Sequence, residues 1–236
     1  MTAIQAILFD KDGTLFDFMA TWGAWTRNLI ADLAAGSGQN ADLLARAVGY
    51  DLGSGTFDPE SPVIAHTPGD IAAALLPHLP GSNPVSLVGR MNALASEATL
   101  APAVPLVPLL GHLKARGLKI GLATNDAEAP ARAHLAQAGV ADFFDFVAGW
   151  DSGYGAKPGT GQMMAFAEQS GVAAARVVMV GDSRHDLVAG RAAGMRTVGV
   201  LTGPARAEDL AFLADAVLPD IGHLPGWLDR LSSGAV

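Results

Sequence analysis

The sequence predicts an α/β fold in which a parallel sheet carries an inserted α-helical domain. Short apolar runs rich in β-branched residues alternate with helix-like stretches along most of the chain, a pattern typical of repeated strand–helix units. The runs are apolar along nearly their whole length, as parallel strands are when helices cover both faces of the sheet. Roughly a hundred residues separate the first run from the second, far more than a crossover needs, so a further domain is expected between them.

Each apolar run supplies one strand, and the stretches between the runs supply the crossover helices. Several runs end in Gly, Asp, Thr or Asn, the residue types that lead a strand into a loop. Strands are expected at residues 3–10, 118–125, 144–150, 176–182, 196–203 and 214–218. Helices are expected at residues 104–116, 126–138, 159–170, 184–193, 206–213 and 221–231.

The interval after the first strand predicts a small helical domain seated over the sheet. Its middle part, residues 49–69, is rich in Gly, Pro and Ser and is expected to be an ordered loop or a flexible connection, and no strand is expected anywhere in the interval. Residues 1–16 and 101–236 would then form the sheet-bearing core, and residues 17–100 the insertion. Helices within the insertion are expected at residues 18–35, 40–48, 69–79 and 84–99.

Composition excludes several classes of function. The 236 residues contain 15 Lys and Arg against 23 Asp and Glu, a net charge of −8, and show no basic cluster suited to a nucleic-acid backbone. The absence of cysteine excludes disulfides, thiolate metal sites and a cysteine nucleophile. No apolar run is long enough to span a membrane, and the first residues do not resemble a signal peptide. We therefore expect a cytoplasmic protein with no nucleic-acid or membrane partner, while the sequence leaves the oligomeric state open.

Polar side chains stand where four of the predicted strands end. In an open parallel sheet the ligand crevice lies at the carboxyl ends of the strands, so these side chains are expected to meet there. They are Asp10 and Asp12 after the first strand, Thr124 and Asn125 after the second, Lys157 after the third, and Asp182 and Asp186 after the fourth.

The aspartates of this group favour a bound divalent cation. Carboxylates that converge at one edge repel one another, by about 4 kcal/mol per pair at 4 Å and an effective dielectric constant near 20. A cation removes that repulsion, and a ligand set of oxygen atoms without cysteine suits Mg²⁺. Asp10 and Asp12 lie two residues apart and would point to one face if strand geometry continues through them, while Gly13 permits a sharp turn beside them.

Taken together, these segments resemble the haloacid dehalogenase (HAD) superfamily. Residues 10–17 read D-x-D-G-T-L-x-D, like the first motif of that family, and residues 181–186 read G-D-S-x-x-D, like its fourth. Thr124 and Lys157 resemble its second and third motifs, in the same order along the chain. The resemblance implies a Rossmann-like parallel sheet core (the HAD fold) with a helical C1-type cap at residues 17–100, most similar to the phosphoglycolate phosphatase-like branch.

The resemblance also implies a phosphoryl-transfer mechanism. Asp10 would attack phosphorus to form an aspartyl-phosphate, and Asp12 would protonate the leaving alcohol and then deprotonate the attacking water. Thr124, Asn125 and Lys157 would bind the substrate, through the threonine hydroxyl, the start of the following helix and the charge of the ammonium group. The expected function is hydrolysis of a small phosphorylated metabolite.

The metal ligands follow from the same resemblance. Mg²⁺ would be held by Asp10, the backbone carbonyl of Asp12 and Asp182. Asp186 would either bind the metal directly or support a group that does, and the sequence leaves the two roles open.

Other readings of the same residues remain. Asp-x-Asp-Gly alone is common turn chemistry, and a lone lysine or threonine in a loop is more often a solvated residue or a helix cap. A phosphosugar mutase would share Asp10, Asp12 and the metal site, and a non-catalytic phosphate-binding module would keep the pocket without turnover. Dehalogenase activity is disfavoured by Asp12, because a halide leaves without a proton. A phosphonatase of this family uses a lysine of the cap to form a Schiff base, and the insertion contains no lysine, so phosphonatase activity is disfavoured.

The substrate itself is less constrained by the sequence. Phosphoglycolate and sugar phosphates are both compatible with the resemblance, and an anionic substrate would need a cation in the insertion, where only Arg27, Arg46 and Arg90 are available. Trp22 and Trp25 are expected to belong to the core of the insertion, and His185 to the surface of a helix.

Overall fold

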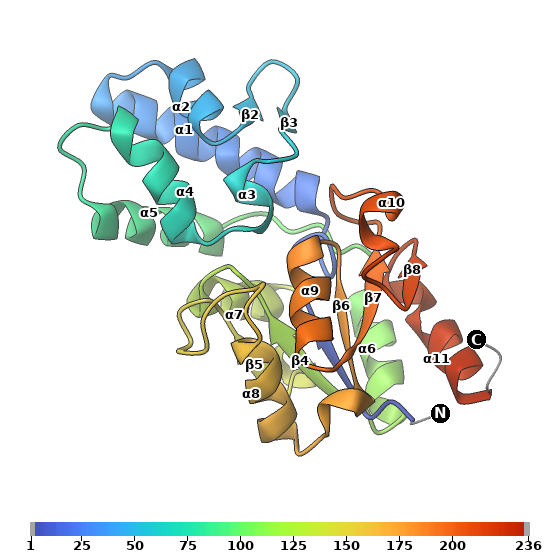
Figure 1. Ribbon diagram of the computed structural model, residues 1–236. Helices are drawn as coiled ribbons and strands as arrows, with labels where there is room; N and C mark the ends of the chain where they lie inside the picture. Colours follow the sequence, from blue (N-terminus) through green and yellow to red (C-terminus); the bar gives the residue numbers. More distant parts are fainter. Residues whose placement is uncertain (1–2, 234–236) are drawn as a thin grey trace.

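A computed structural model, which describes residues 3–233, shows a six-stranded parallel sheet below a helical domain (Figure 1). The strands are β1 (Ala6–Phe9), β4 (Lys119–Ala123), β5 (Phe146–Ala148), β6 (Val177–Gly181), β7 (Arg196–Val200) and β8 (Ala216–Leu218), in the order β5-β4-β1-β6-β7-β8. The α/β prediction is confirmed. Each strand covers only part of its predicted apolar run, because residues at the ends of the run belong to the connecting loops.

Alternation along the strands builds a core on each face of the sheet. Ile7 and Phe9 of β1 pack on one face with apolar residues of α6 (Leu106–Ala115), α7 (Glu128–Gln137) and α11 (Leu224–Ser233). Ala6 and Leu8 pack on the other face with residues of α8 (Gly161–Ser170) and α9 (Arg184–Ala192). This is the period-two alternation expected of a strand buried on both sides. One predicted helix is much shorter than expected, since α10 spans only Ala207–Leu210.

The insertion has a hydrophobic core of its own. The helices of the insertion are a π-helical turn (Met19–Gly23), α1 (Ala24–Ser37), α2 (Ala41–Ala47), α3 (Pro62–Ala65), α4 (Pro68–Leu75) and α5 (Pro84–Ser96). Their buried residues form one cluster that is distinct from the two clusters of the sheet. Short 3₁₀ turns complete the chain at Leu76–His78, Ala141–Phe143, Ala174–Arg176 and Ile221–His223.

The expectation of a loop without strands at residues 49–69 is wrong. That segment contains a two-stranded antiparallel hairpin, β2 (Tyr50–Asp51) and β3 (Thr56–Phe57), followed by α3. The Asp51 carboxylate accepts hydrogen bonds from the backbone and hydroxyl of Ser54, which closes the turn, and the rings of Tyr50 and Phe57 lie 4.8 Å apart across the strands. Local side-chain bonds and one aromatic pair therefore order a segment whose composition indicated a loop.

The two connections between insertion and core lie side by side. The backbone N–H of Asp17 donates to the carbonyl of Ala101 at 2.8 Å, and the N–H of Ala103 donates to the carbonyl of Leu15 at 2.9 Å. The predicted division of the chain at residues 16/17 and 100/101 falls at this paired crossing and stays a prediction. Among residues 3–233, none of the helices has both the length and the hydropathy needed to cross a bilayer.

Candidate active site

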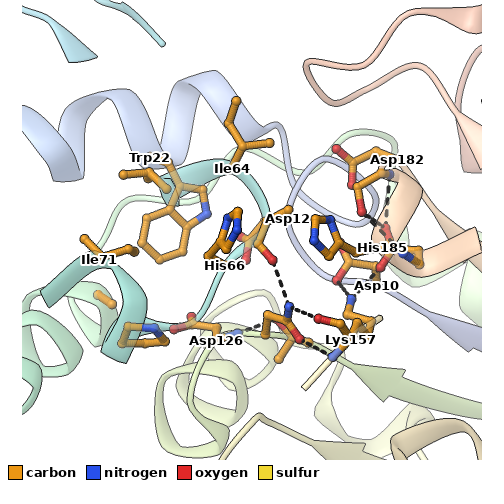
Figure 2. Close-up of a pocket in the computed structure, with 18 of the residues that line it drawn as sticks. Asp10, Asp12, Trp22, Ile64, His66, Ile71, Asp126, Lys157, Asp182 and His185 are labelled. Atoms are coloured by element: carbon orange, nitrogen blue, oxygen red, sulfur yellow. Dashed lines mark hydrogen bonds and ion pairs between the residues drawn. The ribbon is translucent and has the colours of Figure 1, made fainter. Parts of the chain in front are cut away.

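The carboxyl ends of three neighbouring strands bring the predicted site residues into one pocket under the insertion. Asp10 follows β1, Thr124 follows β4 and Asp182 follows β6, and the register pairs Phe9 with the ends of both neighbouring strands. Lys157 reaches the same place from the loop between β5 and α8. These side chains line a pocket whose opposite wall belongs to the insertion, as Figure 2 shows.

Lys157 lies at the centre of the charged groups. Its Nζ atom is 2.5 Å from Asp10 Oδ1 and 2.6 Å from Asp186 Oδ1, and it donates to the backbone carbonyl of Ala123 at 2.9 Å. Burial lowers the pKa of this ammonium group, but the two carboxylates outweigh burial, and the net effect raises the pKa above its ordinary value. Lys157 is therefore a fixed positive charge against Asp10.

Asp10, Asp182 and Asp186 form a buried carboxylate cluster in which each residue offers an oxygen within 4.8 Å of the others. Burial raises the pKa of Asp10 to about 7, with Lys157 opposing the rise and Asp186 adding to it. Burial, followed by the charges of Asp10 and Asp186, raises the pKa of Asp182 well above its ordinary value. A single ammonium does not neutralise three buried carboxylates, so a divalent cation fits the charge, and the oxygen-only donor set fits Mg²⁺.

Asp186 has structural bonds as well as its place in the cluster. Its Oδ2 atom accepts from the backbone N–H of Ser183 at 3.1 Å and from the Ser183 hydroxyl at 2.6 Å, and the Ser183 hydroxyl in turn accepts from the N–H of Asp186. This capping box begins α9. Since Asp186 Oδ1 bonds to Lys157, the residue links the start of the helix to the ammonium group.

Glycine is required on two sides of Asp182. Gly13 has φ +75°, and a Cβ atom there would lie 2.4 Å from Asp182 Oδ2. A Cβ atom on Gly203 would lie only 1.7 Å from the same oxygen. The glycine of the Asp-x-Asp-Gly segment thus permits both the left-handed turn and the close approach of the Asp182 carboxylate.

Without a bound divalent cation, the free energy of unfolding is expected to fall as the pH rises. Asp10, with a pKa raised from 3.8 to about 7, takes up a proton on folding between those values, so the stability that it contributes is present below pH 3.8 and is lost as the pH rises through about 7. A bound cation would replace the missing proton. Calorimetry should therefore show that Mg²⁺ raises Tm more at about pH 8 than at about pH 5.5, whereas an equal rise at both would contradict this electrostatic picture.

Thr124 and Asn125 follow β4 but differ in what their side chains can still bind. Thr124 Oγ1 accepts from the backbone N–H of Asp126 at 3.1 Å, and among the described residues its hydroxyl hydrogen has no acceptor. The Asn125 amide donates to the carbonyls of Ala65 and Lys157, at 2.8 and 2.9 Å, and its oxygen accepts from the Lys157 N–H at 2.8 Å. Asn125 thus holds the lysine loop and the end of α3 together, which leaves its backbone for any contact with substrate.

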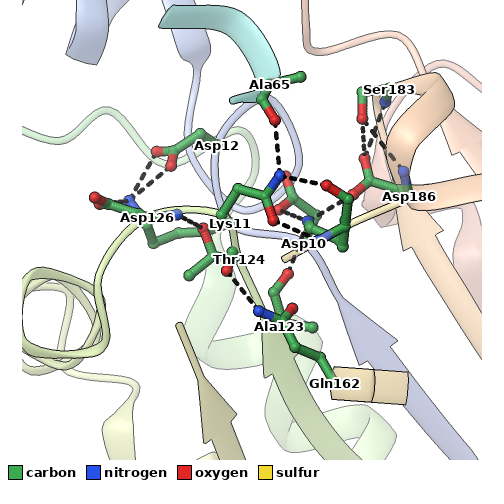
Figure 3. Close-up of polar contacts among 12 residues, drawn as sticks. Asp10, Lys11, Asp12, Ala65, Ala123, Thr124, Asp126, Gln162, Ser183 and Asp186 are labelled. Atoms are coloured by element: carbon green, nitrogen blue, oxygen red, sulfur yellow. Dashed lines mark hydrogen bonds and ion pairs between the residues drawn. The ribbon is translucent and has the colours of Figure 1, made fainter. Parts of the chain in front are cut away.

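A buried network holds Asp12, as Figure 3 shows. Lys11 Nζ lies 2.9 Å from Asp12 Oδ1 and 2.8 Å from Oδ2, 3.3 Å from Asp126 Oδ2 and 3.0 Å from His134 Nδ1. His134 Nε2 lies 2.6 Å from the carbonyl of Ala95 in α5, and because a carbonyl only accepts, Nε2 carries the hydrogen and Nδ1 accepts from Lys11. Burial, aided by the charge of Lys11, lowers the pKa of His134 to about 4, in keeping with a neutral ring.

Sequence reasoning missed Lys11 and His134. Lys11 has no exposed surface, although it lies in the middle of the Asp-x-Asp segment, and His134 lies 123 residues away in α7. A lysine next to a continuous run of buried strand residues is rarely buried without partners. That signal could have identified Lys11 as a residue in need of carboxylates, but it could not have identified His134.

Residues of the insertion form the upper wall of the pocket. Trp22 and Trp25 belong to the core of the insertion, as expected, and also line the pocket. His185 was expected at the surface of a helix, but it is half-buried and lines the pocket, with its ring 5.5 Å from that of His66. His185 lies in the pocket because the insertion approaches the strand ends, which the helical pattern around His185 does not reveal.

Comparisons with known proteins agree with this geometry. Residues 4–194 match the family model of haloacid dehalogenase-like hydrolases. A phosphoglycolate phosphatase of Rhodospirillum rubrum is 39% identical over 120 residues, which are 51% of this chain and 50% of that protein, so the chain spans about half the length of the curated relatives that it matches.

Two solved structures cover nearly the whole chain. A HAD phosphatase from Thermococcus onnurineus has a TM-score of 0.68 at 23% identity, covering 95% of this chain and 98% of its own. A β-phosphoglucomutase from Clostridium difficile has a TM-score of 0.67 at 19% identity, covering 98% and 99%. At these identities the likeness shows the fold alone. The family-model match, which includes all four groups of strand-end residues, shows more: the chain belongs to the haloacid dehalogenase-like hydrolases.

Proposed function

We propose that this chain is a Mg²⁺-dependent phosphatase that hydrolyses a small phosphomonoester through an aspartyl-phosphate on Asp10. The observation that carries the proposal is the position of Asp10, which lies 2.5 Å from the Lys157 ammonium and within the carboxylate cluster of Asp182 and Asp186. An aspartate in this setting has a cation beside it and can face a phosphoryl group that the same charges attract. The phosphatase relatives support the same reaction class.

The substrate phosphate would lie among Asp10, Thr124 and Lys157. The Thr124 hydroxyl hydrogen and the Lys157 ammonium would donate to its oxygens. Asp10, Asp182 and Asp186 would surround the metal ion with the backbone carbonyl of Asp12. The metal, when bound, would neutralise phosphate charge so that a carboxylate can approach phosphorus.

Two displacements at phosphorus complete the reaction. In the first, a carboxylate oxygen of Asp10 forms a bond to phosphorus as the bond to the ester oxygen breaks, and Asp12 gives its proton to the leaving oxygen. In the second, Asp12 takes a proton from water, the water oxygen bonds to phosphorus, and the bond to Asp10 breaks to release inorganic phosphate. Asp12 returns to its protonated state, and the Asp10 carboxylate is restored.

Phosphate release from p-nitrophenyl phosphate, measured with Mg²⁺ and with EDTA, tests the proposal. We expect turnover with the metal and none without it. Binding of phosphate without any turnover would instead support a non-catalytic module. A sugar phosphate that yields an isomer rather than free phosphate would identify a mutase.

Lys11→Met is expected to lower kcat by roughly 10–100-fold with little change in KM, because Lys11 positions Asp12 and does not line the pocket. The loss should be larger for benzyl phosphate, whose alkoxide needs a proton, than for p-nitrophenyl phosphate, whose phenolate leaves without one. Steady-state kinetics on both esters measure this difference. Lys114→Met, which removes a surface ion pair with Asp145, is the matched control, and equal losses on the two esters would leave Lys11 a purely structural role.

A further inference from the structure

The wall that the insertion contributes to the pocket is mostly apolar. Figure 2 shows Trp22, Ile64 and Ile71 across the pocket from Asp10, and Met91 of α5 also lines this wall. Trp22, Ile71 and Met91 are buried, and Ile64 is half-buried. The remaining apolar residues that line the wall are Trp25, Val63, Ala65, Pro68 and Ala95. Only the exposed His66 and the half-buried Asn92 add polar side chains to it.

The arginines of the insertion do not reach this pocket. Arg27 is exposed, and its guanidinium donates to the Tyr50 hydroxyl at 3.3 Å. Arg90 pairs with Asp32 at 2.6 Å on the surface. Arg46 is exposed in α2. Within residues 3–233, the part of the insertion that lines the pocket therefore contains neither lysine nor arginine.

The core side of the pocket also lacks a cation for a second anionic group. It presents five carboxylates, and Lys157 is its one lysine among the described residues, already bonded to Asp10 and Asp186. Lys11 has no exposed surface and is bonded to Asp12. A carboxylate on the leaving alcohol would face Asp12 and Asp126 without a partner, and like charges in a partly dry pocket repel strongly.

Uncharged groups on the leaving alcohol would be better matched. The indole Nε1 of Trp25 is buried without a hydrogen-bond acceptor among the described residues, and the amide of Asn92 lines the same wall. Both can bond to neutral oxygens. The indole rings of Trp22 and Trp25, 4.9 Å apart and nearly perpendicular, offer apolar surface to a ring or an aliphatic face.

We propose that the substrate of this site is a phosphomonoester whose leaving alcohol is uncharged and has an apolar ring face, rather than a short hydroxy acid such as glycolate. The inference rests on the proposed phosphatase function and adds the class of alcohol that the pocket accepts. It follows from the charge of both walls: the phosphate would have Lys157 and the metal, whereas a second anion would meet no further lysine or arginine among the described residues that line the pocket.

Three esters test the charge requirement on the full chain with Mg²⁺. We expect kcat/KM to be at least about tenfold higher for benzyl phosphate than for the same ester with a 4-carboxylate. The value for 2-phosphoglycolate should be lower still. A preference for 2-phosphoglycolate, or equal values for the benzyl pair, would overturn the inference while leaving the phosphatase function in place. If neither these three esters nor p-nitrophenyl phosphate were hydrolysed, the proposed function itself would be overturned, and the inference with it.

A cation placed on the apolar wall gives the reciprocal test. Ile64→Arg, at a half-buried position in the wall, is expected to reduce the preference for benzyl phosphate over its 4-carboxylate by about tenfold, mainly through a lower KM for the carboxylate. Val85→Arg is the matched control, because Val85 is 80% exposed on α5 and does not line the pocket. A similar change in both variants, or no change in Ile64→Arg, would argue against the wall as the determinant of charge selectivity.

Discussion

Asp10→Asn is expected to reduce phosphate release by about 10⁴-fold or more, because the amide cannot act as the nucleophile in the first displacement. The substitution removes one of the three carboxylates of the buried cluster, and burial, which raises the pKa of Asp10, disfavours its charged form when no metal is bound. The variant should therefore fold at least as well as the parent without Mg²⁺. Steady-state phosphate release gives the loss of activity, and thermal unfolding gives the stability.

Trapping of the intermediate separates loss of the nucleophile from other causes. Acid quench of the parent protein with a ³²P-labelled ester should leave label on the chain, and Asp10→Asn should leave none. Asp142→Asn removes an exposed carboxylate from a turn outside the pocket and should behave as the parent does. Activity within tenfold of the parent in Asp10→Asn would exclude an aspartyl-phosphate at this position.

Lys157→Met is expected to have the second-largest effect, on both activity and stability. Loss of the ammonium removes the donor expected to face the phosphoryl oxygens and should lower kcat/KM by about 10²–10³-fold. It also leaves Asp10 and Asp186 without the cation that lies 2.5 and 2.6 Å from them. Breaking a buried pair in this way costs about 3–5 kcal/mol of unfolding free energy. Urea unfolding should show this loss without Mg²⁺ and a smaller one with it, since the metal would supply part of the missing charge.

Lys119→Met provides the comparison for this experiment. The Lys119 side chain is 49% exposed, and its ammonium lies 3.8 Å from Asp145, so its loss should cost less than about 1 kcal/mol and leave turnover unchanged. If Lys157→Met behaved like Lys119→Met in both measurements, the buried ammonium would have no part in catalysis or in holding the carboxylates together.

The local pattern of the chain was sufficient to predict the sheet and most of the candidate site. Continuous apolar runs indicate buried strands, and a parallel sheet places the residues that follow those runs at one edge. Asp10, Thr124 and Asp182 could therefore be placed together without coordinates. The hairpin of Tyr50–Asp51 and Thr56–Phe57 escaped prediction, because two-residue strands carry almost no periodic signal and depend on turn bonds instead.

The order of the polar strand ends and the candidate reactive groups could be inferred from the chain alone, because both depend on residues that are neighbours in the sequence. Three features became evident only in the folded chain: His134 holds Lys11, Asn125 ties Lys157 to the insertion, and an apolar wall rather than an arginine faces the strand ends. Each of these contacts joins segments far apart in sequence. These contacts depend on how distant segments of the core, and the insertion above it, pack together, a property that no local spacing of residues encodes.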